Sequence, residues 1–363
     1  MLAAVRGAKP AAFRDFAGAL LARFYCEALV HGNASPQSAA ALVTAVMGAL
    51  GAHAALSMPE RLALHPRAVL LPYHLAFRLP VPAPNAQEAN AAVHVLLAVG
   101  PATLGATQGS LVELVAHFVR DRAFMQLRTR EQLGYIVLSA VCELGGHAAL
   151  SVTVQSSTHE PVHLESRVDA FLQSMSVTLR DLTPSVFAAN VASARAALLE
   201  APKSLREEHV RQWHEVSSGA YVFDRRKAVA EAMAGVSQGE LVAFYDAVVA
   251  PGGPRRRKLV VHVLAGQSRE PRATSGPGLL PSGDSAERAA VGIGYVSTVS
   301  HVRLDARERV RLAVCAPLAA ERAGGGGTIE IEDIDQWRSW LQFGAPTAAS
   351  AVLPACWRPA GTE

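Results

Sequence analysis

The stretch His159-Glu160-Pro161-Val162-His163 has the spacing H-E-x-x-H, which can bind zinc in a hydrolase. That chemistry needs an α-helix, because a helix places residues four apart on one face beside a shared metal. Proline is tolerated only in the first helical turn and disfavours helical angles in the residue before it. We therefore expect a helix to start near Pro161, with His159 in the preceding loop, so that the histidines do not share a helical face. A hydrolase that uses His159 and His163 as its own zinc ligands is the weaker alternative.

A second stretch, LRTREQLGYIVLSA at residues 127–140, joins cationic and phenolic side chains. In one interpretation it is the end of a helix that turns at Gly134 into a strand, with Arg128 and Arg130 in solvent. In the other, Arg128 and Tyr135 project toward one cavity. A guanidinium and a phenol can both donate hydrogen bonds to a carbonyl oxygen that is acquiring negative charge. The residues alone favour the first interpretation and leave the second open.

The segment RTREQLGYIV resembles the insulin-degrading enzyme (insulysin) branch of the pitrilysin-type zinc metallopeptidases. Four further segments resemble the same family and follow in the same order from about Phe13 to Ala265: EALVHGNAS, HLESRVDAFLQSM, KSLREEHVRQWHEVSSGAYVFDRR and ELVAFYDAVVAPGGPRRRKLVVHVLA. A fainter similarity returns at IEDIDQWRSWLQF. Five ordered segments are more specific than any one motif, so the resemblance favours the second interpretation of residues 127–140.

The resemblance implies a fold and a role. Members of this family are built from four homologous α+β domains, paired into two halves that close around a peptide, with a catalytic zinc on H-x-x-E-H in the N-terminal half. The C-terminal half supplies an arginine and a tyrosine that reach the scissile carbonyl, and these match Arg128 and Tyr135. By the same resemblance, Glu131, Gln132 and Gly134, together with Leu133, shape the turn that presents Tyr135 and contribute to substrate binding.

The sequence also departs from the family. None of its thirteen histidines belongs to an H-x-x-E-H motif, and no segment resembles the N-terminal half. We therefore expect a fragment or a free-standing C-terminal half of a zinc metalloendopeptidase that binds no metal itself, Zn²⁺ belonging to the full-length enzyme. Its expected partners are a peptide substrate and an N-terminal catalytic half, in the same or another chain. The alternative is a catalytically inactive module that binds peptides or forms a homodimer.

Composition fits a large intracellular protein. Half of the 363 residues are apolar, 18% are charged, and the net charge is +3, which indicates neither nucleic acid nor membrane as a partner. The basic run PRRRK at 254–258 is interpreted as a solvated loop before a strand. The four cysteines are scattered, as expected for free thiols in a reducing compartment. We recognise no targeting signal, and expect a cytoplasmic or organellar location.

The pattern of apolar residues predicts an α+β fold in which an antiparallel sheet packs against helices. The family resemblance implies that this fold is like the domains of insulysin and of mitochondrial processing peptidase. Strands are expected at 24–31, near 68–79, and at 90–100, 134–144, 148–156 and 258–265. Helices are expected at 12–23, from Pro36, and at 110–127, 162–180, 184–200, 203–218, 225–234 and 238–249. The resemblance implies a partial third homologous domain (1–67) and a fourth domain (68–266). Composition predicts a flexible tail (267–363), in which 328–343 packs back as a short helix.

Overall fold

The computed structural model of the chain describes residues 7–51, 54–57, 60, 71–73, 75–101, 105–144, 147–266 and 328–331. These residues form two sheets, one of two strands near the N-terminus and one of six strands. In the sequence, the strands of the smaller sheet precede the domain boundary expected between residues 67 and 68, and those of the larger sheet follow it. The domain limits themselves, like the intracellular location, stay predictions.

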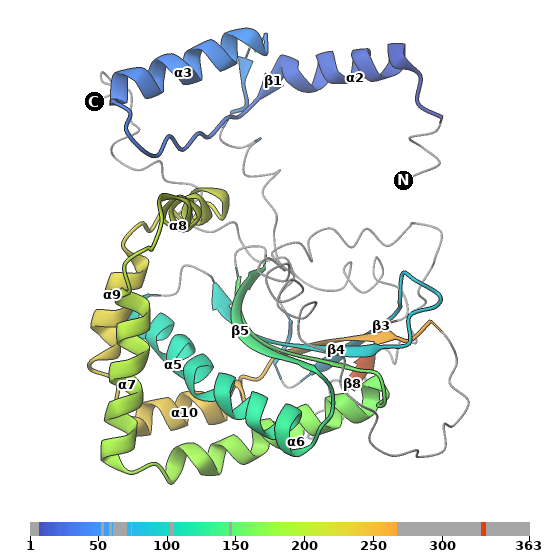
Figure 1. Cartoon of the computed structure of the whole chain (residues 1–363), viewed down its shortest axis with the longest axis vertical. Coiled ribbons are helices and arrows are strands. Elements are labelled where there is room, and N and C mark those ends of the chain that lie inside the picture. Colours follow the sequence, from blue (N-terminus) through green and yellow to red (C-terminus); the bar gives the residue numbers. More distant parts are fainter. Residues whose placement is uncertain are drawn as a thin grey trace, which may run out of the picture.

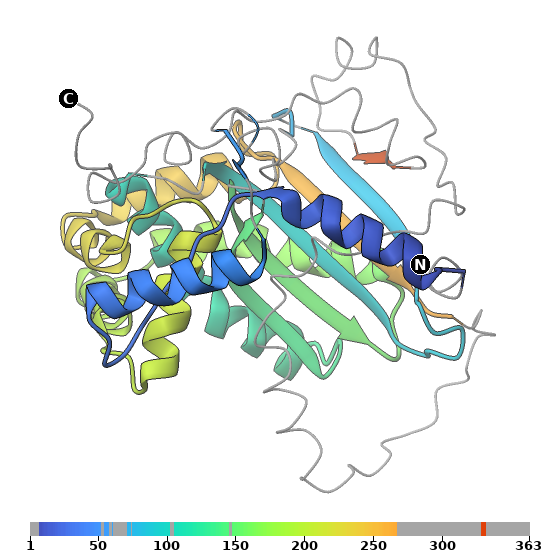
Figure 2. The ribbon, with the colours of Figure 1, turned by 90° about the horizontal axis from the view of Figure 1, so that it is seen from above.

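The N-terminal part contains helix α2 (Pro10–Ala22), strand β1 (Arg23–Phe24), helix α3 (Pro36–Ala49) and strand β2 (Ala54–Ala55), with β1 and β2 parallel. Helix α3 starts where the sequence predicts, because Ser35 caps it by accepting a hydrogen bond from the Ser38 amide at 3.1 Å. The strand expected at 24–31 is wrong beyond Phe24, since residues 25–31 form no regular element. Helices α2 and α3 lie on the opposite side of the larger sheet from α6 and α10 (Figure 1), and α2 passes over its strands in the view from above (Figure 2).

The larger sheet has the strand order β5-β6-β4-β7-β3-β8. Its strands are β3 (Ala76–Pro82), β4 (Ala91–Pro101), β5 (Ile136–Leu144), β6 (His147–Ser156), β7 (Lys258–Leu264) and β8 (Thr328–Glu330). The four strands from β5 to β7 are antiparallel, as predicted, whereas β3 is parallel to both of its neighbours. The sheet is therefore antiparallel over most of its width and mixed at the β3 edge.

Strand β3 runs through two prolines at which the sequence predicted a break. Strand β8 pairs with residues 76–78 only, so the rest of that edge of β3 has no strand beside it among the described residues. The Arg78 carbonyl accepts from the Ile331 amide on the β8 side, and backbone groups two residues apart face the same edge. Pro80 and Pro82 therefore turn their missing N–H toward the open edge, where no ladder hydrogen bond is lost.

The core lies between the sheet and helices α5 (Ala106–Ala123), α6 (Pro161–Arg180) and α10 (Gln238–Val248), which gather on one of its sides (Figure 1). Helices α7 (Pro184–Leu199), α8 (Leu205–Ser217) and α9 (Arg225–Met233) complete the fold. Because side chains of a strand alternate between two faces, alternate residues of β4 and β6 meet as buried pairs. These pairs are Val93 with Val154, Val95 with Val152, and Leu97 with Leu150.

Helix α6 is fixed to this sheet by a cluster of buried charges. Lys258 and His262 lie on the same face of β7 as the buried Val260, so both point at α6. The Lys258 Nζ lies 2.6 Å from carboxylate oxygens of Glu165 and Asp169, which are one helical turn apart. His262 Nε2 lies 2.8 Å from the Glu165 carboxylate, and Arg78 Nε donates to the same carboxylate at 2.9 Å. Each buried charge therefore has a partner of opposite sign, the condition under which burial of charge is tolerated.

The basic run at 254–258 is a loop that leads into β7, as the sequence suggested, but only Pro254 and Arg255 are exposed to solvent. Lys258 is only 3% exposed. Arg256 donates to Asp169 at 2.7 Å, and the Arg257 guanidinium lies 4.0 Å from the ring centroid of Tyr73. Three of its cations are therefore already engaged within the fold.

The tail returns to the sheet through β8, followed by Ile331, which is buried beside Leu71 and Phe77. A strand thus occupies 328–330, where a helix was expected, and residues 332–343 lie outside the described residues. Cys26 and Cys142 are free thiols, and burial raises the pKa of the Cys142 thiol. None of the described helices is long and apolar enough to span a bilayer.

Candidate functional site

The candidate site is built on an irregular end of helix α5. The helix buries Leu114, Phe118 and Val119 and then widens at Phe124–Arg130 into a π-helical segment, η1. A π-helical turn adds one residue per turn and so changes the direction in which the following side chains point. The Glu131 amide donates to the Gln126 carbonyl at 2.9 Å, and the Leu133 amide to the Leu127 carbonyl at 3.0 Å. Because Leu127 and Leu133 are both buried, the segment between them is anchored in the core at each end.

The chain then changes direction sharply into strand β5. Gln132 has φ of 52°, in the left-handed region that residues other than glycine rarely adopt. At Gly134, an added Cβ would lie 1.8 Å from the carbonyl oxygen of Gln155 in β6. Gly134 is therefore required by the close approach of two backbones. Residues 128–135 are called the turn below.

The turn brings together the two residues proposed to act on a carbonyl. The Arg128 guanidinium carbon lies 4.5 Å from the ring centroid of Tyr135 and also 4.5 Å from that of Phe124. Tyr135 is 66% exposed. Stacking occupies the face of a planar guanidinium and leaves the N–H donors on its edge available. Within the described part of the chain, neither Arg128 nor the Tyr135 hydroxyl has a hydrogen bond or ion pair, so both keep donors for a ligand.

Glu131 points into the protein. Its carboxylate accepts from Arg167 of α6 at 2.7 and 3.0 Å and from the Gln126 side chain at 2.7 Å. The hydrogen bonds from Arg167 hold the pKa of Glu131 below its ordinary value, with a smaller contribution from Gln126 and against the opposing effect of burial. Sequence reasoning missed Phe124, Gln126 and Arg167. The spacing of four between Phe124 and Arg128 was a usable signal for a stacked pair on a helix, whereas nothing local marks Arg167.

The H-E-x-x-H stretch lies at the start of helix α6, as predicted. The helix begins at Pro161, and Glu160 before it is extended, with φ −73° and ψ 153°. His159 is outside the helix, yet its ring stacks on that of His163 with centroids 4.9 Å apart. The two rings therefore lie close together although they share no helical face. Their nearest additional partner is the Thr158 hydroxyl, 2.9 Å from His159 Nδ1.

A zinc site was tested against the residues present. Among the described residues, no three histidine, cysteine, aspartate or glutamate side chains lie close enough together to hold a metal ion. The two stacked histidines would supply only two ligands, whereas zinc in proteins has three or four. The described part of this chain therefore does not fit a zinc site.

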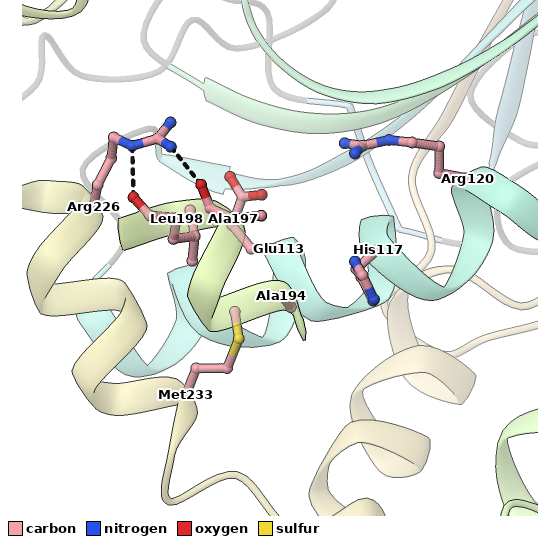
Figure 3. Close-up of a pocket in the computed structure, with 8 residues that line it drawn as sticks. All are labelled: Glu113, His117, Arg120, Ala194, Ala197, Leu198, Arg226 and Met233. Carbon is pink, nitrogen blue, oxygen red and sulfur yellow. Dashed lines mark hydrogen bonds between the residues drawn. The ribbon is translucent and has the colours of Figure 1, made fainter. Parts of the chain in front are cut away.

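A cavity of about 190 Å³ opens between α5, α7 and α9 (Figure 3). Its apolar wall includes Ala194, Leu198 and Met233, and its polar residues include Glu113 and Arg226. Arg226 donates to the carbonyls of Leu198 and Ala197, both at 2.9 Å. Burial raises the pKa of Glu113, against the opposing charges of Arg120 and Arg226. None of its lining residues belongs to the turn.

Comparison with known proteins places these features in a family. Residues 114–213, which include the turn, match the family described as PQQ synthase PqqF-like, C-terminal lobe domain 4. Human insulin-degrading enzyme is 32% identical over 254 residues, which cover 69% of this chain and 24% of the enzyme. The mug138 protein of Schizosaccharomyces pombe, a relative named as a zinc protease, is 27% identical over 251 residues, 69% of this chain and 25% of that protein.

The fold agrees with these sequence matches. The crystal structure of pitrilysin superposes with a TM-score of 0.58 at 17% identity, covering 87% of this chain and 27% of pitrilysin. The chain thus spans about a quarter of the length of the relatives that it matches. The chain belongs to the insulysin branch of the pitrilysin-type zinc metallopeptidase family.

Proposed function

We propose that this chain is the C-terminal part of an insulysin-like zinc metalloendopeptidase, in which it binds the peptide and stabilises the scissile carbonyl. The observation that carries the proposal is the contact of Arg128 with the exposed Tyr135, 4.5 Å from guanidinium carbon to ring centroid. Family membership supports it, because two relatives are named as an insulin-degrading enzyme and a zinc protease.

The chemistry assigned to the turn is hydrogen-bond donation. The N–H groups of Arg128 and the hydroxyl of Tyr135 would donate to the oxygen of the carbonyl under attack, whose negative charge grows as the reaction proceeds. Such donors favour the transition state over the ground state, and losing one typically lowers the rate about a hundredfold. Phe124 and the ring of Tyr135 would hold the guanidinium in place without using its donors.

The zinc of the family would be held elsewhere, because the described residues offer no suitable group of ligands. We therefore assign the metal to a catalytic half in the same or another chain. The partner of this chain would be that half, and the ligand shared between the two would be a peptide.

The test combines this chain with a separately produced N-terminal half of human insulin-degrading enzyme and follows hydrolysis of insulin. We expect hydrolysis only in the mixture, with a loss of about a hundredfold for Arg128→Ala and for Tyr135→Phe. Arg130→Ala is the matched control, because Arg130 lies in the same segment and, among the described residues, hydrogen-bonds only the Gln126 side chain, at 3.4 Å. Binding of fluorescent insulin to the chain alone is measured in parallel. An inactive mixture and no binding by the chain alone would together contradict the proposal.

A second candidate, an inactive module that binds peptides or forms a homodimer, is favoured by one observation. Phe13, Phe16 and Leu20 on α2 lie three and four residues apart, and so on one face of the helix, and are 65%, 62% and 58% exposed. Clustered apolar residues at a surface favour association. Sedimentation velocity would separate the candidates: a dimer that dissociates in a Phe13→Ser, Phe16→Ser variant supports the second, whereas a monomer that binds peptide supports the first.

A further inference from the structure

We infer that Arg167 of helix α6 is a positioning residue for Arg128 and Tyr135, and that it acts through Glu131. The inference rests on the proposed function and extends it to a residue that touches neither the substrate nor the reacting atoms. It also gives Glu131 a different role from the substrate contact that the family resemblance implied.

The first step is the geometry of the contact. Arg167 Nε donates to Oε2 of Glu131 at 2.7 Å and Nη2 donates to Oε1 at 3.0 Å, so the pair is bidentate. The Gln126 side chain donates to Oε1 at 2.7 Å. Three donors from two different elements thus fix one carboxylate, and a bidentate guanidinium–carboxylate pair fixes orientation as well as distance.

The second step is the location of Glu131 in the turn. It follows η1 directly, three residues after Arg128 and four before Tyr135. The next residue, Gln132, has the left-handed φ of 52°. Such a conformation is unfavourable in a residue other than glycine and persists only where the surroundings enforce it. The side chain of Glu131, fixed on one side of Gln132, supplies part of that enforcement, and Gly134 packed against β6 supplies the rest.

The third step is the rigidity of the helix that carries Arg167. Its neighbours Leu164 and Val168 are fully buried in the core, and Glu165 is held by the buried charges of β7. Arg167 therefore extends from a fixed backbone. Its side chain is 39% exposed and that of Glu131 is 15% exposed, so the contact is partly screened from water and worth more than a freely exposed ion pair.

The decisive measurement is hydrogen exchange of the Glu131 and Leu133 amides in the whole chain. In Arg167→Ala we expect both amides to exchange at least about tenfold faster, since opening the turn becomes easier by about 1.4 kcal/mol for each factor of ten. Amides of β4 and β6 should not change. Arg167→Lys, which keeps the charge but not the bidentate geometry, should give an intermediate rate. The charge-swapped Glu131→Arg, Arg167→Glu variant should recover most of the protection.

Arg180→Ala is the matched control, because Arg180 lies on the same helix and pairs with Asp246, away from the turn. The second readout is the affinity of each variant for fluorescent insulin. We expect Arg167→Ala to weaken binding about fivefold and the charge-swapped variant to restore it.

The possible failures are distinguishable. Unchanged exchange in Arg167→Ala would overturn the inference. Faster exchange with unchanged affinity, in a protein whose Arg128→Ala variant binds more weakly, would also overturn it, because the turn would then not need Arg167 to bind peptide. If Arg128→Ala itself binds as the unchanged chain does, the proposed function fails, whatever the exchange rates are.

Discussion

Helix α6 joins two groups of charged residues that differ in what they leave available. Glu165 contacts the cations of the sheet, and Arg167, two residues later, contacts Glu131 of the turn. Side chains two residues apart on an α-helix are rotated by about 200° around its axis and so point to nearly opposite sides. One helix can therefore contact both groups. Glu165, Lys258 and His262 are nearly inaccessible to water, whereas the turn ends at the exposed Tyr135.

The difference shows what marks a site for a ligand. Around Glu165, the side chains of Lys258, Arg78 and His262 are all directed at Glu165 or at Asp169. Burial by itself would raise the pKa of Glu165, but hydrogen bonds from His262 and Lys258 and the charges of Lys258 and Arg78 outweigh it and hold the pKa at about 2. This strong perturbation serves the fold. In the turn, the pKa of Glu131 is shifted less than that of Glu165. The N–H donors of Arg128 and the hydroxyl of Tyr135, however, have no hydrogen-bond partner among the described residues.

The largest expected effect is on the buried group. Glu165→Gln removes the negative charge that Lys258, Arg78 and His262 contact, and leaves the buried Lys258 with only Asp169 as an anionic partner. Breaking a buried ion pair from one side costs about 3–5 kcal/mol. We therefore expect the free energy of unfolding, measured with urea, to fall by about that much. Arg180→Ala, which removes a partly exposed pair on the same helix, should cost no more than about 1 kcal/mol. A loss as small as that in Glu165→Gln would show that the two groups do not differ in kind.

A smaller effect is expected where the turn meets the sheet. Gly134→Ala places a Cβ 1.8 Å from the Gln155 carbonyl oxygen, and only a backbone shift can relieve that overlap. Overpacking of this kind costs about 1–3 kcal/mol. We expect unfolding to be easier by that amount and insulin binding to weaken as well, because Tyr135 follows directly. Gly239→Ala is the control, since nothing lies within 4 Å of a Cβ there. Equal stabilities of the two variants would contradict the structure of the turn.

Much of this architecture could be predicted from the sequence. Pro161 and Pro36 are helix-start residues, and both helices begin at them. The predicted helices and the strands of the antiparallel part agree with the structure to within a few residues, because their apolar spacing is regular. The pairing of Arg128 with Tyr135 was suggested by the family resemblance, since the residues alone favoured a solvated helix end.

The rest depends on contacts between distant residues. Arg167 is 36 residues from Glu131, and Lys258 is 93 residues from Glu165, so no local pattern joins either pair. The π-helical segment was missed because the sequence FMQLRTR also suits an α-helix. The strand predicted near 68–79 ends before Pro80, whereas β3 continues to Pro82. The sequence could not show this, because the open edge that tolerates the prolines depends on β8 pairing with residues 76–78 alone.

The smallest expected effect compares the two carboxylates in acid. Both have a folded-state pKa below the ordinary value of 4.5, so each stabilises the fold above that value and loses its contribution as the pH falls through the folded pKa. For Glu165 this loss extends from about pH 5 to about pH 2. In Glu165→Gln the decline of unfolding free energy with acid should therefore be much shallower than in the unchanged chain. Glu131→Gln should flatten it less, by about 1 kcal/mol over the same range.

The measurement is a series of urea titrations between pH 7 and pH 2.5, with slopes compared among the three proteins. Glu240→Gln serves as the control. The pKa of Glu240 is also lowered, by hydrogen bonds from the amide and hydroxyl of Ser237, but Glu240 lies at an exposed helix start away from both groups. If Glu131→Gln flattened the acid decline more than Glu165→Gln, the turn would be the more tightly held group. The contact of Arg167 with Glu131 would then hold the turn that carries Arg128 and Tyr135 more firmly than the buried group holds helix α6 to the sheet.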